Sequence, residues 1–452
     1  MDSSDSGGVE EFVVCGFDSN LERFAAVSAD NRLKVWEVAT GQLRHHFAQP
    51  THLSSTYTCL SWGQSAADAI AGSKKKRGKS RELIALGTAQ GDVVCWDLAK
   101  GEIVQSMRTK DEGEGGRRVH DVCFDSKCAA LFSCGEGSHI LQWAVVDAAA
   151  ASSSQHKAVR RFKAEKRGVY KLALSNDDSL LIGAGRAHIK VWELASGRTV
   201  CKFPSHASAT ASLALSAPLP ALFGANPALL LSSAAHDRLV NVWPIGHAVS
   251  HADVSELEIS APLLGLPCPA APFVVSVNLH RSTDVVATST AAASKRGKKR
   301  KHGESDAVTA SDDASSNTDA ADGAMHQFHI LAVQTNQVSV FEVHSSGKLT
   351  AEPSSSAKGT STTTSVHSQL TLPRTSDGSP FLYAGFKGAS ELLVVRGSLA
   401  KPHFQTLVRY HCITAQHSRE RLTRRYGACR NTLQLRVHSR NPCRSHNYHR
   451  TC

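Results

Sequence analysis

The sequence predicts an all-β fold, a seven-bladed β-propeller, and three observations support this prediction. A short phrase ending in Trp recurs five times, at Trp36, Trp96, Trp143, Trp192 and Trp243, with spacings of 60, 47, 49 and 51 residues. An internal period of this size indicates a repeat architecture. Each phrase alternates apolar residues with others, as a strand does, and in LKVWEVATG and IKVWELASG a hairpin turn follows. Two further repeats keep the strand rhythm without Trp, which brings the expected number of blades to seven.

Each Trp phrase is expected to form the third strand of a four-stranded blade. The first blade is predicted as Phe12–Phe17, Phe24–Ser28, Leu33–Val38 and Leu43–Phe47, and the fourth as Val169–Leu174, Leu180–Ala184, Ile189–Leu194 and Thr199–Phe203. The sixth is predicted as Phe273–Leu279, Val285–Ser289, Ile330–Gln334 and Val338–Val343, with Phe341 where Trp would stand. For the seventh blade only Leu382–Phe386, Glu391–Arg396 and Phe404–Val408 have a strand pattern.

Polar residues at fixed places in the repeat are predicted to be structural. Asp30 precedes Trp36, with Ser28 close by, and Asp237 precedes Trp243, with His206 in the preceding loop. At the Asp position the second, third and fourth blades have instead Gln90, Gly137 and Arg186. A buried chain of Asp, His, Ser and Trp satisfies its own hydrogen bonds and makes a blade rigid. We therefore expect the Asp and Trp residues of the repeat to belong to the framework of the blades.

The composition does not favour an enzyme or a metalloprotein. The sequence has no nucleophile elbow, phosphate-binding glycine loop, HExxH motif or paired carboxylates at helical spacing, so we predict no catalytic residue and no cofactor. None of the 12 cysteines forms a C-x-x-C pair, so no metal site is predicted. Six cysteines fall in predicted strands, which fits a reduced intracellular protein: Cys15, Cys59, Cys95, Cys123, Cys134 and Cys201. No segment has the pattern of a signal peptide or a membrane span, and neither a membrane nor a small-molecule substrate is an expected partner.

Low-complexity inserts interrupt the blades at about 64–81, 291–327 and 352–368. Segments this polar cannot bury enough apolar surface to fold, so disordered surface loops are expected. The first two contain basic clusters, namely Lys74, Lys75, Lys76, Arg77 and Lys79, and Lys295, Arg296, Lys298, Lys299, Arg300 and Lys301. Such clusters on accessible loops are typical of nuclear import signals or phosphate-binding patches. The alternative is a solubilising loop without a receptor. The third insert is rich in Ser and Thr and is predicted to be a spacer.

Residues 411–452 differ in character from the predicted propeller, which spans residues 10–410. They contain nine Arg, no Lys and one acidic residue, and they account for most of the net charge of +11. One interpretation is an Arg-rich RNA-binding tail that folds on its partner. A second is a Cys/His metal site, although the cysteine spacings match no known finger. We favour a third, an irregular basic tail that is disordered or an artefact of the gene model.

Several stretches resemble a particular family. They are HLSSTYTCLSW (52–62), ELIALGTAQGDVVCWDLAKGE (82–102), AAHDRLVNVWPI (234–245) and PFLYAGFKGASELLVVRGSLAKPHFQTL (380–407). Strands that end in Trp-Asp or Trp-Glu at this period resemble WD repeats. These four stretches resemble the second, fifth and seventh blades of the nucleolar WD-repeat protein 43 family, whose members are a subunit of the transcription-coupled subcomplex of the small-subunit processome. The resemblance covers roughly residues 10–408 and includes the position of the basic insert in the second blade.

This resemblance implies a non-catalytic scaffold in the nucleus and nucleolus. Such a scaffold would act in pre-18S rRNA processing, ribosome biogenesis and rRNA transcription. Its expected partners are other processome proteins, WD-repeat subunits among them, and pre-rRNA reached through the assembly. The helical C-terminal domain of the family is missing, so the sequence is expected to be C-terminally truncated. The alternative is a WD-repeat substrate receptor or adaptor of a ubiquitin ligase or chromatin complex, which would show a ring of Arg or aromatic residues at its channel mouth.

Overall fold

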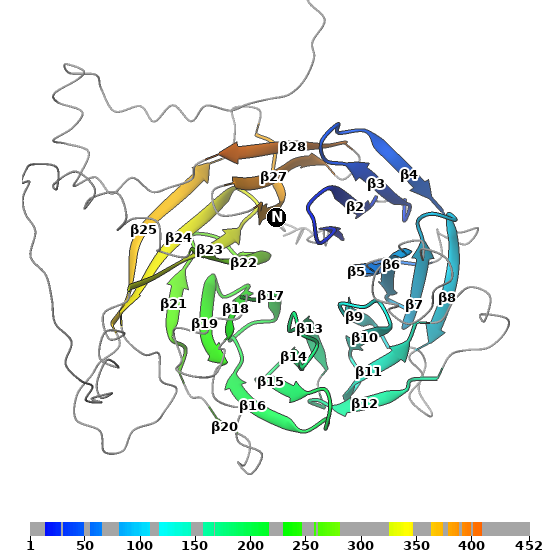
Figure 1. The fold of residues 1–452 in the computed structure, drawn as a ribbon, viewed down its shortest axis with the longest axis horizontal. Helices are drawn as coiled ribbons and strands as arrows, with labels where there is room; N and C mark the ends of the chain where they lie inside the picture. Colours follow the sequence, from blue (N-terminus) through cyan, green and yellow to red (C-terminus); the bar gives the residue numbers. More distant parts are fainter. Residues whose placement is uncertain are drawn as a thin grey trace, which may run out of the picture.

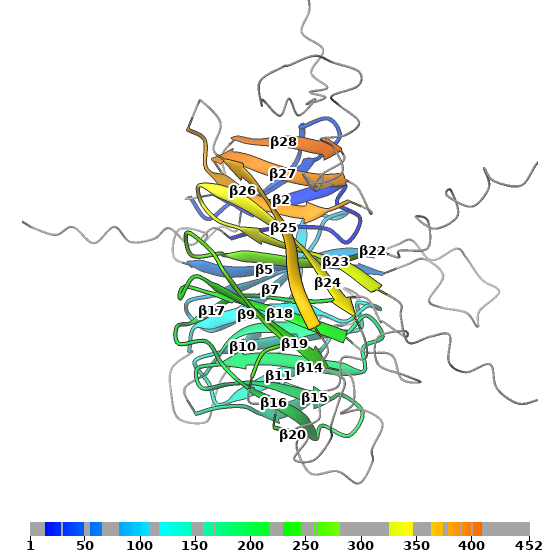
Figure 2. The same cartoon turned by 90° about the vertical axis from the view of Figure 1, so that its left-hand side faces the viewer.

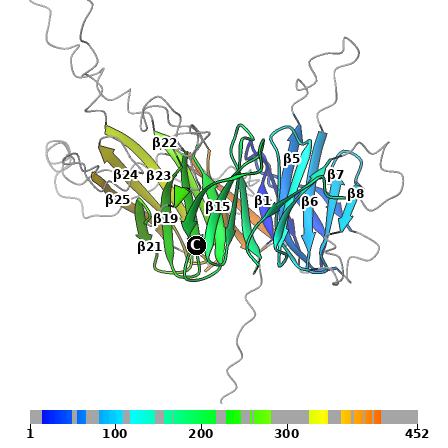
Figure 3. The ribbon, with the colours of Figure 1, turned by 90° about the horizontal axis from the view of Figure 1, so that it is seen from below.

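Seven small antiparallel sheets are arranged as a ring around a central axis in the computed structural model (Figure 1). The structure describes residues 14–28, 30–48, 55–65, 81–108, 117–145, 157–166, 168–216, 229–245, 257–258, 261–280, 325–346, 363–373, 378–387, 391–398 and 401–408. Each sheet is one blade, and its strands cross the thickness of a disc (Figures 2 and 3). The prediction of an all-β, seven-bladed propeller is confirmed.

Consecutive strands pair within each blade, from the innermost to the outermost. The first blade contains β1 (Cys15–Phe17), β2 (Arg23–Val27), β3 (Leu33–Glu37) and β4 (Leu43–Phe47). The second contains β5 (Tyr57–Ser65), β6 (Arg81–Thr88), β7 (Asp92–Asp97) and β8 (Glu102–Arg108). The third contains β9 (Val119–Phe124), β10 (Ala130–Gly135), β11 (His139–Ala144) and β12 (Arg160–Lys163). The fourth contains β13 (Val169–Leu174), β14 (Leu180–Gly185), β15 (His188–Glu193) and β16 (Thr199–Pro204), and the short β20 (Leu257–Glu258) pairs in parallel with β16.

The remaining three blades complete the ring. The fifth contains β17 (Thr210–Leu215), β18 (Leu229–Ala235), β19 (Leu239–Ile245) and β21 (Leu264–Pro267). The sixth contains β22 (Val274–His280), β23 (Met325–Val333), β24 (Gln337–Ser346) and β25 (Thr363–Pro373). The seventh has three strands among the described residues: β26 (Phe381–Phe386), β27 (Glu391–Ser398) and β28 (Lys401–Val408).

The sixth blade differs from the prediction by one strand. Ile330–Gln334 falls largely in the second strand, β23, and Val338–Val343 lies in the third, β24. The fourth strand is β25, which begins inside the segment 352–368 that the sequence predicts to be a spacer. An outermost strand packs on the core through one face only, so Ser- and Thr-rich sequence can form it. The predicted strand Val285–Ser289 lies outside the described residues.

The hydrophobic core consists of seven clusters of buried side chains, one at each interface between neighbouring blades. In each Trp blade the repeat Trp faces the preceding blade. Trp96 stacks on Phe47 of β4, with ring centroids 5.3 Å apart, and Trp243 packs on Phe203 of β16 at 5.2 Å. Phe341 has the equivalent place, between the fifth and sixth blades. The Trp phrase therefore recurs in the sequence because each copy contributes one Trp to one interface between blades.

Aromatic packing joins the seventh blade to the first. Phe17 contacts Phe24 and Tyr383, with centroid distances of 5.0 and 5.1 Å, and Phe404 of β28 meets Phe24 edge-on at 5.7 Å. Trp36 and Val395 belong to the same cluster. Phe404 of β28 thus packs against an aromatic side chain of the first blade. Phe47 of β4 packs in the same way against the second blade, and Phe203 of β16 against the fifth.

The disc has two faces, which we name by the connections that they carry. The first strands of neighbouring blades pack side by side around the axis and run in the same direction (Figure 1). The insert face is the one at which first strands end and second strands begin, as at 125–129 and 175–179. The tetrad face carries the turns from second to third strands and the entries into first strands, for example around His206 and Asp237. The basic inserts join β5 to β6 and β22 to β23, so both leave from the insert face.

Candidate functional site

The five repeat Trp side chains are buried in the blade interfaces. Their exposed fractions lie between 1% and 5%: Trp36, Trp96, Trp143, Trp192 and Trp243. An aromatic side chain of this size buries about 150–250 Å² and contributes mainly to packing. Indole rings at this depth are not accessible to a ligand in the closed ring, so they form the framework of the protein.

The fifth blade contains a complete hydrogen-bonded tetrad. His206, which is 5% exposed, lies in the connection into β17 and contacts Asp237 through Nδ1 at 3.0 Å. Its Nε2 lies 2.8 Å from Oγ of Ser233 on β18, and Trp243 Nε1 donates to the same Oγ at 3.4 Å. The four groups satisfy one another away from water, which is the arrangement of a rigid structural network.

The first and second blades have only parts of this network. The strand register pairs Phe24 with Trp36 and Leu231 with Trp243, so Ala26 is the equivalent of Ser233. Ser28, which the sequence suggested as a network member, lies instead at the turn, where it donates to Asp30 and to the Arg32 carbonyl. The hydrogen bond from the Ser28 hydroxyl to the Asp30 carboxylate holds the pKa of Asp30 below its usual value.

The second blade has Leu86 at the Ser position, since Ile84 pairs with Trp96. Trp96 Nε1 accordingly has no hydrogen-bond partner among the described residues, although it is buried. Its indole contributes packing against Phe47 without the polar half of the tetrad. The network is therefore not required in every blade, which agrees with its absence from the second blade's sequence.

The fourth blade has a different polar pair at the same place. Its hairpin is one residue shorter, because Leu181 pairs with Trp192, and Arg186 is exposed at the turn. Glu165 lies four residues before the start of its blade, as His206 does, and accepts from His188 Nδ1 at 2.8 Å and from the Ala187 N–H at 2.9 Å. A carboxylate from the entry connection thus replaces the imidazole of the fifth blade.

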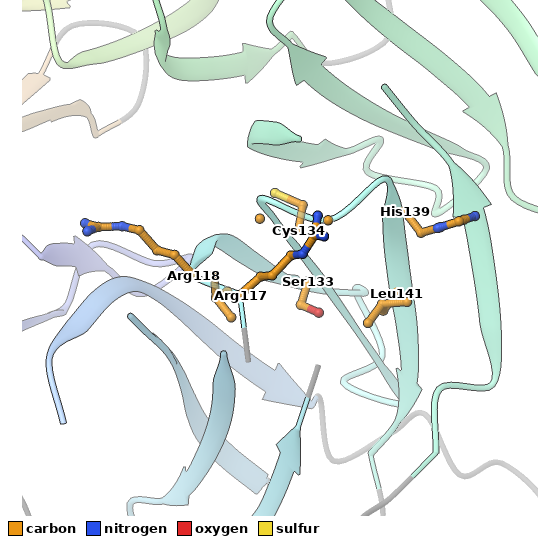
Figure 4. A pocket seen from close by; sticks show the side chains of 9 residues that line it. Arg117, Arg118, Ser133, Cys134, His139 and Leu141 are labelled. Atoms are coloured by element: carbon orange, nitrogen blue, oxygen red, sulfur yellow. The ribbon is translucent and has the colours of Figure 1, made fainter. Parts of the chain in front are cut away.

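The third blade keeps Ser and Trp but has a pocket where the other two groups would lie. Trp143 Nε1 donates to Ser133 Oγ at 2.8 Å. Beside Ser133, a small, partly open pocket of about 30 Å³ lies at the tetrad face. The lining residues come from the entry into β9 and from the β10–β11 hairpin: Arg117, Arg118, Val119, Ser133, Cys134, Gly135, Gly137, His139 and Leu141. Figure 4 shows Arg117 extending toward Cys134, whereas Arg118 extends away on the opposite side.

Charged residues of the inner strands connect neighbouring blades. Asp121 of β9 accepts from the Leu172 N–H of β13 at 2.9 Å, and Lys171 Nζ lies 3.6 Å from its other oxygen. Burial on its own would lower the pKa of Lys171, but the Asp121 carboxylate outweighs it and the pKa is raised. Lys171 therefore stays protonated beside Asp121, and the contact joins the third blade to the fourth.

The six cysteines predicted to lie in strands all do so, and among the described residues none of them forms a disulfide. Burial raises the pKa of the Cys15 and Cys59 thiols to about 12 and raises that of Cys123 and Cys134 well above the usual value. Protonated thiols are poor nucleophiles and poor metal ligands. In the part of the chain that the structure describes, no cluster of His, Cys, Asp or Glu is placed to hold a metal ion. Among the same residues no helix is long and apolar enough to span a membrane.

The basic clusters and the tail lie outside the described residues. This applies to Lys74–Lys79, to Lys295–Lys301 and to residues 411–452, while the strands that flank the two inserts are described. Gly137 departs from the repeat in the sequence, but the pocket beside it was not predicted. The sequence contains a signal for it. The third blade keeps Ser133 and Trp143 of the tetrad but has Gly137 at the Asp position, so two members of the tetrad lack their partners.

No protein-family model matches the chain. It is 31% identical over 247 residues to human WD repeat-containing protein 43, a match that takes in 52% of this chain and 35% of that protein. The chain thus matches about a third of the length of this relative. A chain in the crystal structure of a mitotic checkpoint complex has a TM-score of 0.50 and 12% identity, and the match covers 88% of this chain and 87% of that one. At such identity the likeness shows the fold alone. The chain is therefore a WD-repeat propeller that is similar, over half its length, to WD repeat-containing protein 43.

Proposed function

We propose that the chain is a non-catalytic scaffold of the nucleolar small-subunit processome, where it acts in pre-18S rRNA processing and rRNA transcription. The observation that carries this proposal is the 31% identity to human WD repeat-containing protein 43. A rigid disc with two faces and a rim suits a scaffold, because each blade contributes its own loops to the surface. The partners would be other processome proteins, WD-repeat subunits among them, and pre-rRNA reached through the assembly.

The two basic inserts support a nuclear site of action. Both leave the disc on the insert face, because each joins the first strand of its blade to the second. Eleven Lys and Arg side chains in two clusters would bind an import receptor or, within the assembly, RNA phosphates: Lys74, Lys75, Lys76, Arg77, Lys79, Lys295, Arg296, Lys298, Lys299, Arg300 and Lys301.

Crosslinking followed by purification of the tagged chain tests the processome role. We expect pre-rRNA to be recovered well above other nuclear RNAs, and the tagged chain to concentrate in the nucleolus while rRNA is transcribed. Recovery of ubiquitin-ligase or chromatin subunits in place of pre-rRNA would favour the alternative of a substrate receptor. A diffuse cytoplasmic signal would contradict the proposal.

Replacing all eleven basic residues of the inserts by Ala tests their role separately. The variant should lose nuclear accumulation. A control variant replaces the nine Arg of residues 411–452 by Ala, which removes a similar charge from elsewhere, and should accumulate as the unmodified chain does. If the insert variant still accumulates in the nucleus, the inserts are not import signals.

A further inference from the structure

We propose that the pocket of the third blade binds an Asp or Glu side chain of a partner protein, which takes the place of the missing members of the tetrad. This inference concerns the chemistry of one pocket on the tetrad face. It holds whichever assembly the chain joins, so it does not depend on the proposed function.

The equivalence between the third and fifth blades defines what the pocket has lost. Leu131 pairs with Trp143 as Leu231 pairs with Trp243, so Ser133 is the equivalent of Ser233 and Gly137 of Asp237. In the fifth blade an imidazole and a carboxylate fill the space beyond the Ser hydroxyl. In the third blade the same space is the pocket, lined by Ser133 and Gly137.

The floor of the pocket has hydrogen-bonding capacity to spare. Ser133 is 1% exposed, and its Oγ accepts from Trp143 Nε1. The equivalent hydroxyl of the fifth blade has a second partner, His206 Nε2, 2.8 Å away. Among the described residues the Ser133 hydroxyl has only the Trp143 contact, so its own proton is available to an acceptor that enters the pocket. A buried donor without an acceptor costs free energy that a ligand recovers.

The charge at the pocket favours an anionic acceptor. Arg117 lines it and extends toward Cys134, next to Ser133 in the chain (Figure 4). A guanidinium is suited to bidentate binding of a carboxylate, and the buried walls formed by Val119 and Cys134 strengthen such a hydrogen bond by excluding water. Arg117 also donates to the carbonyl of Glu136 at 3.3 Å, which holds it at the pocket rim.

The depth of the pocket favours a side chain over a nucleic-acid phosphate. A carboxylate on one or two methylene groups can reach a hydroxyl that is 1% exposed, as Asp237 and His206 reach into the fifth blade. A phosphodiester carries a sugar on both sides and is bound at open basic surfaces.

The test uses the full chain with ¹⁵N-labelled Trp, because the Trp143 indole N–H reports directly on Ser133 Oγ. The probe is an acetylated and amidated Gly-Gly-Asp-Gly-Gly peptide, titrated to about 20 mM, with the Asn peptide, a phosphoserine peptide and oligouridylate as comparisons. We expect the Asp peptide alone to shift the Trp143 signal, assigned through Trp143→Phe, while the other indole signals stay in place and report an intact fold. Arg117→Ala should weaken binding about tenfold or more, because a hydrogen bond to a charged group is lost. Arg186→Ala, on an exposed side chain of the same face, is the matched control and should bind as the unmodified chain does.

Gly137→Asp supplies the missing carboxylate from the chain itself. It should shift the Trp143 signal without peptide and abolish the response to the Asp peptide. No shift with the Asp peptide at any concentration, an equal response to the Asn peptide, or a response to oligouridylate only would each overturn the proposal. A further outcome would also overturn the proposal. If the unmodified chain does not respond to the Asp peptide, but a Glu112→Gln, Glu114→Gln double variant has a shifted Trp143 signal and does respond, then an acidic residue of the chain itself occupies the pocket.

Discussion

Replacing Ser233 by Ala should destabilise the protein more than the same change at Ser133, although both residues accept a hydrogen bond from a buried Trp. Ser233 connects three groups of the fifth blade, because its Oγ contacts His206 at 2.8 Å and Trp243 at 3.4 Å. Ser133 contacts Trp143 alone among the described residues. The comparison measures what the tetrad adds to a blade.

The magnitude follows from the burial of the groups left behind. His206 is 5% exposed and Trp243 is 1% exposed, so Ser233→Ala leaves two polar groups without their partner and with little access to water. Each such group costs about 1–3 kcal/mol, and the long Trp243 contact lies at the low end, so we expect about 2–4 kcal/mol. Ser133→Ala leaves one group, the Trp143 indole N–H, without its partner, and we expect about 1 kcal/mol.

Urea unfolding followed by Trp fluorescence measures the difference. A shifted midpoint with an unchanged slope reports a change in the free energy of unfolding. Ser196→Ala is the control, because this exposed hydroxyl bonds Glu193 in solvent, and it should lie within about 0.5 kcal/mol of the unmodified chain. If Ser233→Ala costs no more than Ser133→Ala, the tetrad is not the stabilising unit described above.

Three further predictions concern single residues. Burial raises the pKa of Cys59 to about 12, so only about 10⁻⁴ of this thiol is ionised at pH 8, and iodoacetamide should leave it unmodified in the native chain but label it in urea, as mass spectrometry can show. Gly41 has φ of +68° and nothing within 4 Å of an added Cβ, so Gly41→Ala should lower the free energy of unfolding by about 1–2 kcal/mol through backbone strain alone. Urea unfolding measures this change, and Gly265→Ala is the control and should be close to neutral. Partial burial on its own would raise the pKa of Asp177, but hydrogen bonds from Ser175 and Ser179 outweigh it and lower the pKa. The ionised carboxylate therefore stabilises the fold above the pKa that Asp177 has in the unfolded chain, and this stabilisation is lost as the pH falls through its pKa in the folded chain. An NMR titration should find a higher pKa for Asp177 in the Ser175→Ala variant.

Much of the fold could be predicted because the repeat is local in sequence. The alternation of LKVWE or IKVWE makes a strand with one buried face, and the glycine four residues after Glu37 or Glu193 ends it in a turn with positive φ. The prediction failed at β25. Its first six residues, 363–368, are mostly Ser and Thr and were taken for part of a spacer, although Leu370 and Leu372 of the same strand pack against the core.

The polar network was harder to predict because its members come from different connections. Asp237, Trp243 and His206 were correctly predicted to lie together, but Ser28 and Asp30 were predicted to form the same network and instead form a local turn contact. Spacing alone cannot separate Ser28 from the true equivalent, Ala26, because the assignment depends on which residue lies across the hairpin from Trp36.

By itself, then, the sequence determined the seven-fold repeat, the strands that carry the Trp residues and the blades that receive the basic inserts. Only the tertiary structure decided that each Trp faces the preceding blade, that Phe404 joins the ring to Phe24, and that Arg117, Ser133 and Gly137 enclose one pocket. The physical reason is the range of the interactions. Strand periodicity arises from neighbouring residues, whereas a pocket or a ring closure arises from side chains that the closed disc brings together from separate strands and connections.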